Sequence, residues 1–212
     1  MVDCTSHKRE GTDLYITEGL SALGPYLYVR NKETQAVLPI RGKIKNVVGI
    51  SLKEALKNAE ICDIANAIGA GVGGACDASK SRYEKIIISA DADEDGKQIT
   101  CLLMALFVNL LPDIVQSGRL YIVSAPLYCW GKTKKEFGGC DRIDDIPATV
   151  KEYHRMKGLG ELQNEQVEYY LVNPKTRHLL QVNYPSNIDE FNHIMGTSDG
   201  KNNLYKELGI IV

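Results

Sequence analysis

One stretch of the chain switches from a strand-like pattern to a helix-like pattern and back again. Residues 85–90 form a continuous run rich in isoleucine, which is typical of a strand buried on both faces in a parallel sheet. Apolar residues then recur at helical spacing over residues 99–110, until Pro112 ends the pattern. Residues 119–123 predict the next strand. Strand, helix and strand in this order form a βαβ unit, which predicts an α/β fold with a parallel sheet.

An acidic cluster occupies the turn between the first strand and the helix. Asp91, Asp93 and Asp95 alternate along the chain and are followed by Gly96, so the three carboxylates would point the same way if the backbone stayed extended. Neighbouring carboxylates repel one another, and a divalent cation relieves that repulsion. Oxygen ligands favour Mg²⁺ over zinc. Because ligands bind at the carboxyl ends of strands in such sheets, the cluster predicts a magnesium site there.

Three other interpretations of the cluster compete with this one. An EF-hand loop that begins at Asp91 requires a bidentate glutamate at its twelfth position, which is Leu102 here. A phosphatase with an aspartyl nucleophile also has Asp-x-Asp after an apolar strand, but Thr or Val is expected where Asp95 stands. A solvated acidic turn is the plainest alternative, yet it leaves the strand and the glycine on either side unexplained.

The composition excludes several classes of protein. The 212 residues suit one domain, or one domain with an extension. The longest apolar run, residues 99–111, is too short to cross a bilayer, and no apolar stretch follows the charged N-terminal residues, so we expect no membrane contact, no secretory signal and a cytoplasmic location. The six cysteines lack Cys-x-x-Cys spacing, which predicts free thiols. A net charge of −2 restricts any DNA contact to a local patch.

Weaker patterns predict the other elements. Residues 69–74 are rich in glycine, but no apolar strand precedes them and no Lys-Ser/Thr pair follows, so they predict a loop and not a phosphate-binding site. The remaining predictions are a strand at 14–17 that ends at Glu18, a helix that begins near residue 21, helical spacing over 51–66, helices at 146–153, 164–172 and 189–195, and a strand at 179–182.

Six motifs together resemble one known family. They occur in the order seen in the TOPRIM region of type IIA DNA topoisomerases, the gyrase B and topoisomerase II family, and the resemblance runs from about Asp3 to Met195. The motifs are Glu18-Gly19-Leu20-Ser21-Ala22, residues 39–47 (Pro-Ile-Arg-Gly-Lys-Ile-Lys-Asn-Val), residues 68–71 (Ile-Gly-Ala-Gly), residues 82–88 leading into the acidic cluster, residues 125–128 (Ala-Pro-Leu-Tyr) and residues 157–162 (Lys-Gly-Leu-Gly-Glu-Leu).

The resemblance implies a fold and a metal site. The fold is a TOPRIM (Rossmann-like) parallel sheet flanked by helices, with a core over residues 1–130 and a smaller C-terminal α+β extension over residues 131–212. One or two Mg²⁺ ions are implied at the scissile DNA phosphate, and we expect Mn²⁺ to substitute for them. The implied metal ligands are Glu18, Asp91, Asp93 and Asp95, the first three of which are implied to be catalytic.

The resemblance also implies DNA-binding residues. The strip with Arg41, Lys43 and Lys45 matches a part of the family that faces DNA, where cations position phosphates without recognising sequence. A solvated loop of mixed charge is the alternative for this strip. Lys157 is the fourth implied DNA-binding residue, although its motif could equally pack against the core.

Two positions depart from the family. Leu20 and Gln98 stand where an aspartate and often a histidine are usual. Leucine can neither cap the following helix nor orient a metal ligand, so both departures affect the surroundings of the site and leave the four principal carboxylates in place. Drift of this kind in a short chain resembles viral enzymes of the T-even phage sort.

The family also implies partners. Its enzymes need an ATPase module of the GHKL (gyrase and histidine kinase) type and a winged-helix breakage module that bears the nucleophilic tyrosine, and motifs over nearly all 212 residues leave room for neither. We therefore expect an incomplete part of an ATP-dependent type IIA topoisomerase, either a split subunit or an excised domain, that acts on double-stranded DNA in a bacterial or phage-infected cell. The alternatives are a stand-alone TOPRIM nuclease or primase, and an assembly module that has lost metal binding.

The tyrosines that fall in or beside predicted elements make poor nucleophiles. They are Tyr83, Tyr121, Tyr128, Tyr153, Tyr169 and Tyr170.

Overall fold

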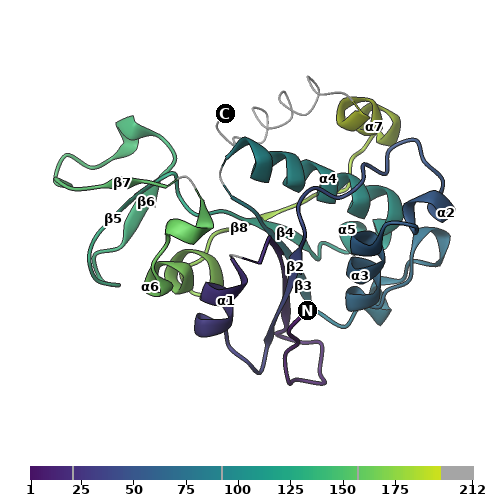
Figure 1. Cartoon of the computed structure of the whole chain (residues 1–212), viewed down its shortest axis with the longest axis horizontal. Helices are drawn as coiled ribbons and strands as arrows, with labels where there is room; N and C mark the ends of the chain where they lie inside the picture. The colour runs from purple at the N-terminus through teal and green to yellow at the C-terminus, as the bar shows by residue number, and fades with distance from the viewer. Residues whose placement is uncertain (21, 92, 157, 197–212) are drawn as a thin grey trace.

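The main feature of the fold is a five-stranded sheet with the strand order β2-β1-β3-β4-β8 (Figure 1). The computed structural model describes residues 1–20, 22–91, 93–156 and 158–196. The first four strands of the order are parallel, and β8 pairs antiparallel with β4. The α/β prediction with a mainly parallel sheet is therefore confirmed. The strands are β1 (Asp13–Glu18), β2 (Gln35–Ile40), β3 (Lys85–Ser89), β4 (Leu120–Val123) and β8 (Leu179–Gln181).

Helices cover both faces of this sheet. Along β1 and β3, side chains alternate between two hydrophobic clusters: Leu14 and Ile88 face one, whereas Tyr15 and Ile87 face the other. The first cluster packs against α3, α4, α5 and α7, and the second packs against α1 and α6 (Figure 1). The helices are α1 (Leu23–Val29), α2 (Leu52–Ala55), α3 (Ala59–Ile68), α4 (Glu94–Leu110), α5 (Pro112–Gln116), α6 (Asn164–Val167), which continues into the π-helical turn η5 (Glu168–Val172), and α7 (Ile188–Gly196).

A smaller antiparallel sheet lies beside α6 (Figure 1). Its strands, in the order β6-β5-β7, are β5 (Tyr128–Trp130), β6 (Gly138–Cys140) and β7 (His154–Arg155). The C-terminal part of the chain forms this sheet and also returns to the main sheet through β8. Residues on both sides of the predicted division at 130/131 therefore share one sheet.

Several predicted elements are confirmed. They are the strands at 14–17, 85–90, 119–123 and 179–182 and the helices at 99–110, 164–172 and 189–195, each within a few residues of the observed bounds. The helical spacing over 51–66 proves to be two helices, because α2 ends at Ala55 and the Asn58 side chain then caps α3 by accepting a hydrogen bond from the Ile61 N–H at 3.1 Å.

The predicted helix at 146–153 is wrong. Pro147 opens a turn there, closed by a hydrogen bond from the Val150 N–H to the Pro147 carbonyl at 2.8 Å, and the chain then runs extended into β7. Nearly all of these side chains are exposed, so a helix would have no apolar face to bury. Strand β2 was not predicted. It tolerates Pro39 because it lies at the edge of the sheet.

The cysteines and the lengths of the helices can be compared with the predictions from the sequence. All six cysteines lie among them and are free thiols, as predicted. Within the same ranges, no helix has both the length and the apolar character needed to span a membrane.

Candidate active site

The carboxyl ends of β1 and β3 bring Glu18 and Asp91 together. The two strands are parallel neighbours, so the residues that end them meet at one edge of the sheet. Glu18 is the last residue of β1, and Gly19 then turns the chain with a left-handed φ of 70° while its N–H donates to the Ile40 carbonyl of β2. The backbone N–H of Asp91 lies 3.3 Å from Glu18 Oε2, across 73 residues of sequence. The structure thus brings together two of the four predicted metal ligands.

The second part of the acidic cluster forms the start of α4, so Asp95 does not lie on an extended backbone. Asp93 is the N-cap of α4, and its Oδ1 accepts a hydrogen bond from the Gly96 N–H at 2.8 Å. A Cβ at Gly96 would lie 2.1 Å from the Asp91 carbonyl oxygen, so only glycine fits there. The cap uses one of the two Asp93 oxygens, and it places Glu94 and Asp95 in the first helical turn, where the helix dipole favours negative charge.

Burial and mutual repulsion act on the two acids at the strand ends. Burial, with the charges of Asp91, Asp93 and Asp95 added to it, raises the pKa of Glu18. Burial also raises the pKa of Asp91, to which the charges of Asp93 and Glu161 contribute, although the hydrogen bond from the Leu159 N–H acts in the opposite direction. A cation at this edge would remove the repulsion that both carboxylates experience.

The predicted DNA-facing strip lies beside the start of α4. Its apolar residues Ile44 and Val47 are buried in the core, whereas Arg41, Lys43 and Lys45 are exposed. Buried anchors that alternate with exposed cations distinguish this strip from a loop with no fixed orientation.

Ion pairs engage two cations of the strip. Lys43 Nζ lies 2.7 Å from Asp95 Oδ1, and Lys45 Nζ lies 2.9 Å from Glu54 Oε1. Both pairs are largely exposed, so each is worth about 1 kcal/mol or less and exchanges readily for another partner. The predicted DNA-binding residue Lys157 lies outside the described residues.

The donor set suits a hard cation, but the ligands are not all gathered. Every candidate is a carboxylate, which is the chemistry that Mg²⁺ prefers. Among the described residues, however, no three acidic, histidine or cysteine side chains are grouped closely enough to hold one ion. The reason is visible in the contacts: Asp93 caps α4 and Asp95 pairs with Lys43. Closing the site around an ion requires these two side chains to turn toward Glu18 and Asp91.

The segment after Lys157 contributes a contact whose role the sequence left open. The N–H of Leu159 donates to Asp91 Oδ1 at 2.7 Å, so this segment packs against the site. In the sequence, this segment is marked by the Lys-Gly-Leu-Gly motif. The two departures from the family lie at the surface: the Leu20 side chain is 66% exposed, and Gln98 is exposed on α4.

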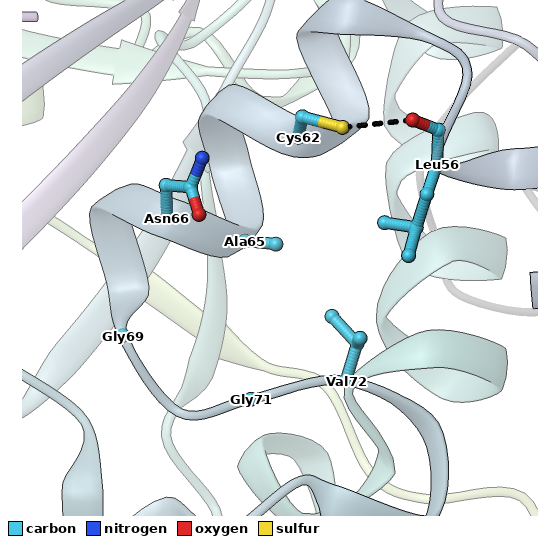
Figure 2. A pocket seen from close by; sticks show the side chains of 7 residues that line it. All are labelled: Leu56, Cys62, Ala65, Asn66, Gly69, Gly71 and Val72. Carbon is cyan, nitrogen blue, oxygen red and sulfur yellow. Dashed lines mark hydrogen bonds between the residues drawn. The ribbon is translucent and has the colours of Figure 1, made fainter. Parts of the chain in front are cut away.

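The glycine-rich loop forms an open hollow with α3 (Figure 2), separate from the acidic residues. Its lining is mainly apolar and includes Leu56 and Val72, and the Cys62 thiol donates to the Leu56 carbonyl at 3.0 Å. Gly69 ends α3 with a φ of 74°, and a Cβ at Gly71 would lie 2.5 Å from the Ala75 carbonyl oxygen. The glycines therefore serve the turn, and no charged side chain lines the hollow.

Comparison with known proteins assigns the chain to a family. A family model described as the Toprim domain matches residues 13–125. The chain belongs to the Toprim domain family.

More specific relatives narrow this class. The chain is 43% identical over 188 residues to the B subunit of DNA gyrase from Thermotoga maritima, a match that covers 86% of this chain and 30% of that protein. It is 40% identical over 191 residues to the B subunit of DNA topoisomerase 4 from Rickettsia prowazekii, with 86% and 29% covered. The chain thus spans about 30% of the length of these relatives. The resemblance to the TOPRIM region of this family is confirmed.

Proposed function

We propose that the chain supplies the Mg²⁺-dependent DNA cleavage and religation part of an ATP-dependent type IIA topoisomerase. One observation carries the proposal: Glu18 and Asp91 lie together at the strand ends in a chain about 40% identical to the B subunits of gyrase and topoisomerase 4. Its partners are double-stranded DNA, a GHKL ATPase module and a breakage subunit whose winged-helix domain bears the nucleophilic tyrosine.

Each acidic residue has a role in this proposal. Glu18 and Asp91 hold one ion, Asp91 and Asp93 hold a second, and Asp95 is an auxiliary ligand that acts directly or through water. Mg²⁺ held by these residues would neutralise charge that develops on the phosphoryl and leaving 3′ oxygens. On religation, the 3′ hydroxyl would attack phosphorus and displace the partner's tyrosine, and the Glu18 carboxylate would accept the proton that the 3′ hydroxyl loses.

The exposed cations position the DNA. Arg41, Lys43 and Lys45 contact phosphates near the cleavage point without recognising bases, and we assign the same role to Lys157. Lys43 reaches a phosphate by exchanging its pair with Asp95, which also frees that carboxylate.

The proposed metal site is tested with Asp91→Ala. We expect the parent to bind Mn²⁺ in the millimolar range, measured by calorimetry or by water proton relaxation, and the variant to bind it several-fold more weakly because a shared ligand is lost. Asp63→Ala is the matched control, since Asp63 is exposed on α3 and its removal changes the net charge equally. Undiminished Mn²⁺ binding in Asp91→Ala would refute the assignment.

The DNA-facing strip is tested by replacing Lys43 and Lys45 together with alanine. We expect association with all DNA sequences to weaken to a similar extent. The slope of log affinity against log salt should flatten by about one unit for each phosphate interaction that the substitutions remove. Fluorescence anisotropy across a salt series measures both. The control replaces Lys8 and Lys32, which are exposed and precede β1 and β2 at the opposite edge of the sheet. If the slopes of log affinity against log salt were equal for the parent and the Lys43/Lys45 variant, the strip would be a solvated loop and not a DNA contact.

A further inference from the structure

We propose that Gly158 and the backbone of Leu159 form a positioning element for the Asp91 carboxylate, so that the metal site is completed from outside the Toprim match. The inference rests on the proposed function, because it concerns how Asp91 binds metal. Both residues lie beyond residues 13–125, which the Toprim model matches. The element touches Asp91 and not the reacting atoms.

One hydrogen bond holds the Asp91 carboxylate, and the lack of a side chain at Gly158 leaves room for it. The Leu159 N–H donates to Asp91 Oδ1 at 2.7 Å. A Cβ placed on Gly158 would lie 3.1 Å from Asp91 Oδ2, 3.3 Å from its Cγ and 3.6 Å from Oδ1. A side chain at position 158 would therefore require the Asp91 carboxylate to shift by a few tenths of an ångström.

The need for glycine at position 158 comes from this contact and not from the backbone. Gly158 has φ −154° and ψ 161°, an extended conformation that any residue adopts. Gly160 lies two residues further along, and a Cβ there would meet nothing within 4 Å. A side chain would therefore meet the Asp91 carboxylate at position 158 but not at position 160.

The element is held in place by the core. Leu159 is only 4% exposed and belongs to the hydrophobic cluster that contains Tyr15 of β1 and Ile87 of β3. These are the strands that lead to Glu18 and Asp91. The Leu159 N–H is thereby fixed relative to the strand ends, and its hydrogen bond leaves Asp91 Oδ2 as the oxygen for a cation.

A carboxylate that is already oriented binds a cation more tightly, since less side-chain freedom is lost on binding. Partners that hold a metal ligand by hydrogen bonds typically change metal affinity by about 10–100-fold when they are removed. A methyl group at position 158 should push the Asp91 carboxylate out of its orientation and weaken its hydrogen bond with Leu159.

The test compares Gly158→Ala with Gly160→Ala in the full chain. We expect Gly158→Ala to weaken Mn²⁺ binding about tenfold, measured by electron paramagnetic resonance of free and bound Mn²⁺, and to alter the spectrum of the bound ion. Gly160→Ala should match the parent in both. DNA association in the absence of metal should be unchanged in both variants, because neither substitution removes one of the proposed DNA-binding cations.

A second experiment tests whether Gly158→Ala acts by destabilising the fold. If Gly158→Ala lowers the melting temperature, adding Asp91→Ala should restore most of it, because the added methyl then meets no carboxylate. Parent-like Mn²⁺ binding in Gly158→Ala, or a stability loss that Asp91→Ala does not relieve, overturns the positioning role. Failure of the proposed function is distinguished by Asp91→Ala alone: parent and Asp91→Ala would then bind Mn²⁺ equally.

Discussion

Asp91→Asn should abolish DNA cleavage by the complex reconstituted with an ATPase module and a tyrosine-bearing breakage subunit, with a rate loss of about 10²-fold or more. The substitution removes a shared metal ligand and keeps nearly the same side-chain volume, so the variant should still assemble. Cleavage of supercoiled plasmid measures the activity, and gel filtration measures assembly. Asp63→Asn provides the control, because Asp63 is exposed on α3.

The purified chain alone should neither hydrolyse ATP nor cut DNA. Phosphodiester transfer requires a nucleophile aligned within about 3–3.5 Å of phosphorus, which metal ions do not supply. Tyr83 and Tyr170 are buried, and Tyr153 is 42% exposed but follows the turn that leads into β7. Plasmid nicking by the chain alone, if lost with Asp91→Asn, would identify a stand-alone nuclease instead.

Arg177→Met should lower the free energy of unfolding by about 3–5 kcal/mol, the usual cost of leaving one partner of a buried ion pair alone. Arg177 Nη1 lies 2.7 Å from Asp13 Oδ2, and both side chains are only 5% exposed. Gln35 Nε2 donates to the same oxygen at 3.2 Å, and the Arg177 guanidinium also donates to the Tyr15 hydroxyl. These contacts connect the N-terminal end of β1 with the segment that follows η5.

Equilibrium unfolding in urea measures this loss. Lys132→Met is the matched control, because its pair with Glu152 spans 3.7 Å with side chains 86% and 78% exposed, and we expect it to change stability by less than about 0.5 kcal/mol. Adding Asp13→Asn to Arg177→Met should recover part of the loss by removing the buried charge. A loss below about 1 kcal/mol for Arg177→Met would show that water reaches Asp13.

The βαβ unit could be predicted because each of its elements has a strong local pattern. The isoleucines of β3 and the apolar stripe of α4 are buried as expected, and a parallel sheet necessarily brings the ends of neighbouring strands together. The position of Glu18 beside Asp91 followed from the family resemblance together with this rule. Short elements with weak patterns, such as β2 and β7, were beyond sequence reasoning because contacts from other segments determine them.

Side-chain partners far apart in sequence were equally unpredictable. Nothing in the local sequence indicates that Lys43 pairs with Asp95, 52 residues away, or that Gly158 faces a carboxylate. The apolar spacing at 146–153 was misleading for the opposite reason. The pattern is present, but no surface is available there for a helix to cover.

The return of β8 to the main sheet has a consequence for how this molecule can be divided. A fragment that stops after residue 130 would keep all four acidic residues, the strip with Lys43 and the whole of the Toprim match at residues 13–125. It would lack the neighbour of β4, the guanidinium that neutralises Asp13, and the peptide group that holds Asp91. We therefore expect the smallest part of this chain that folds with an ordered site to extend well beyond residues 13–125, which the Toprim model matches.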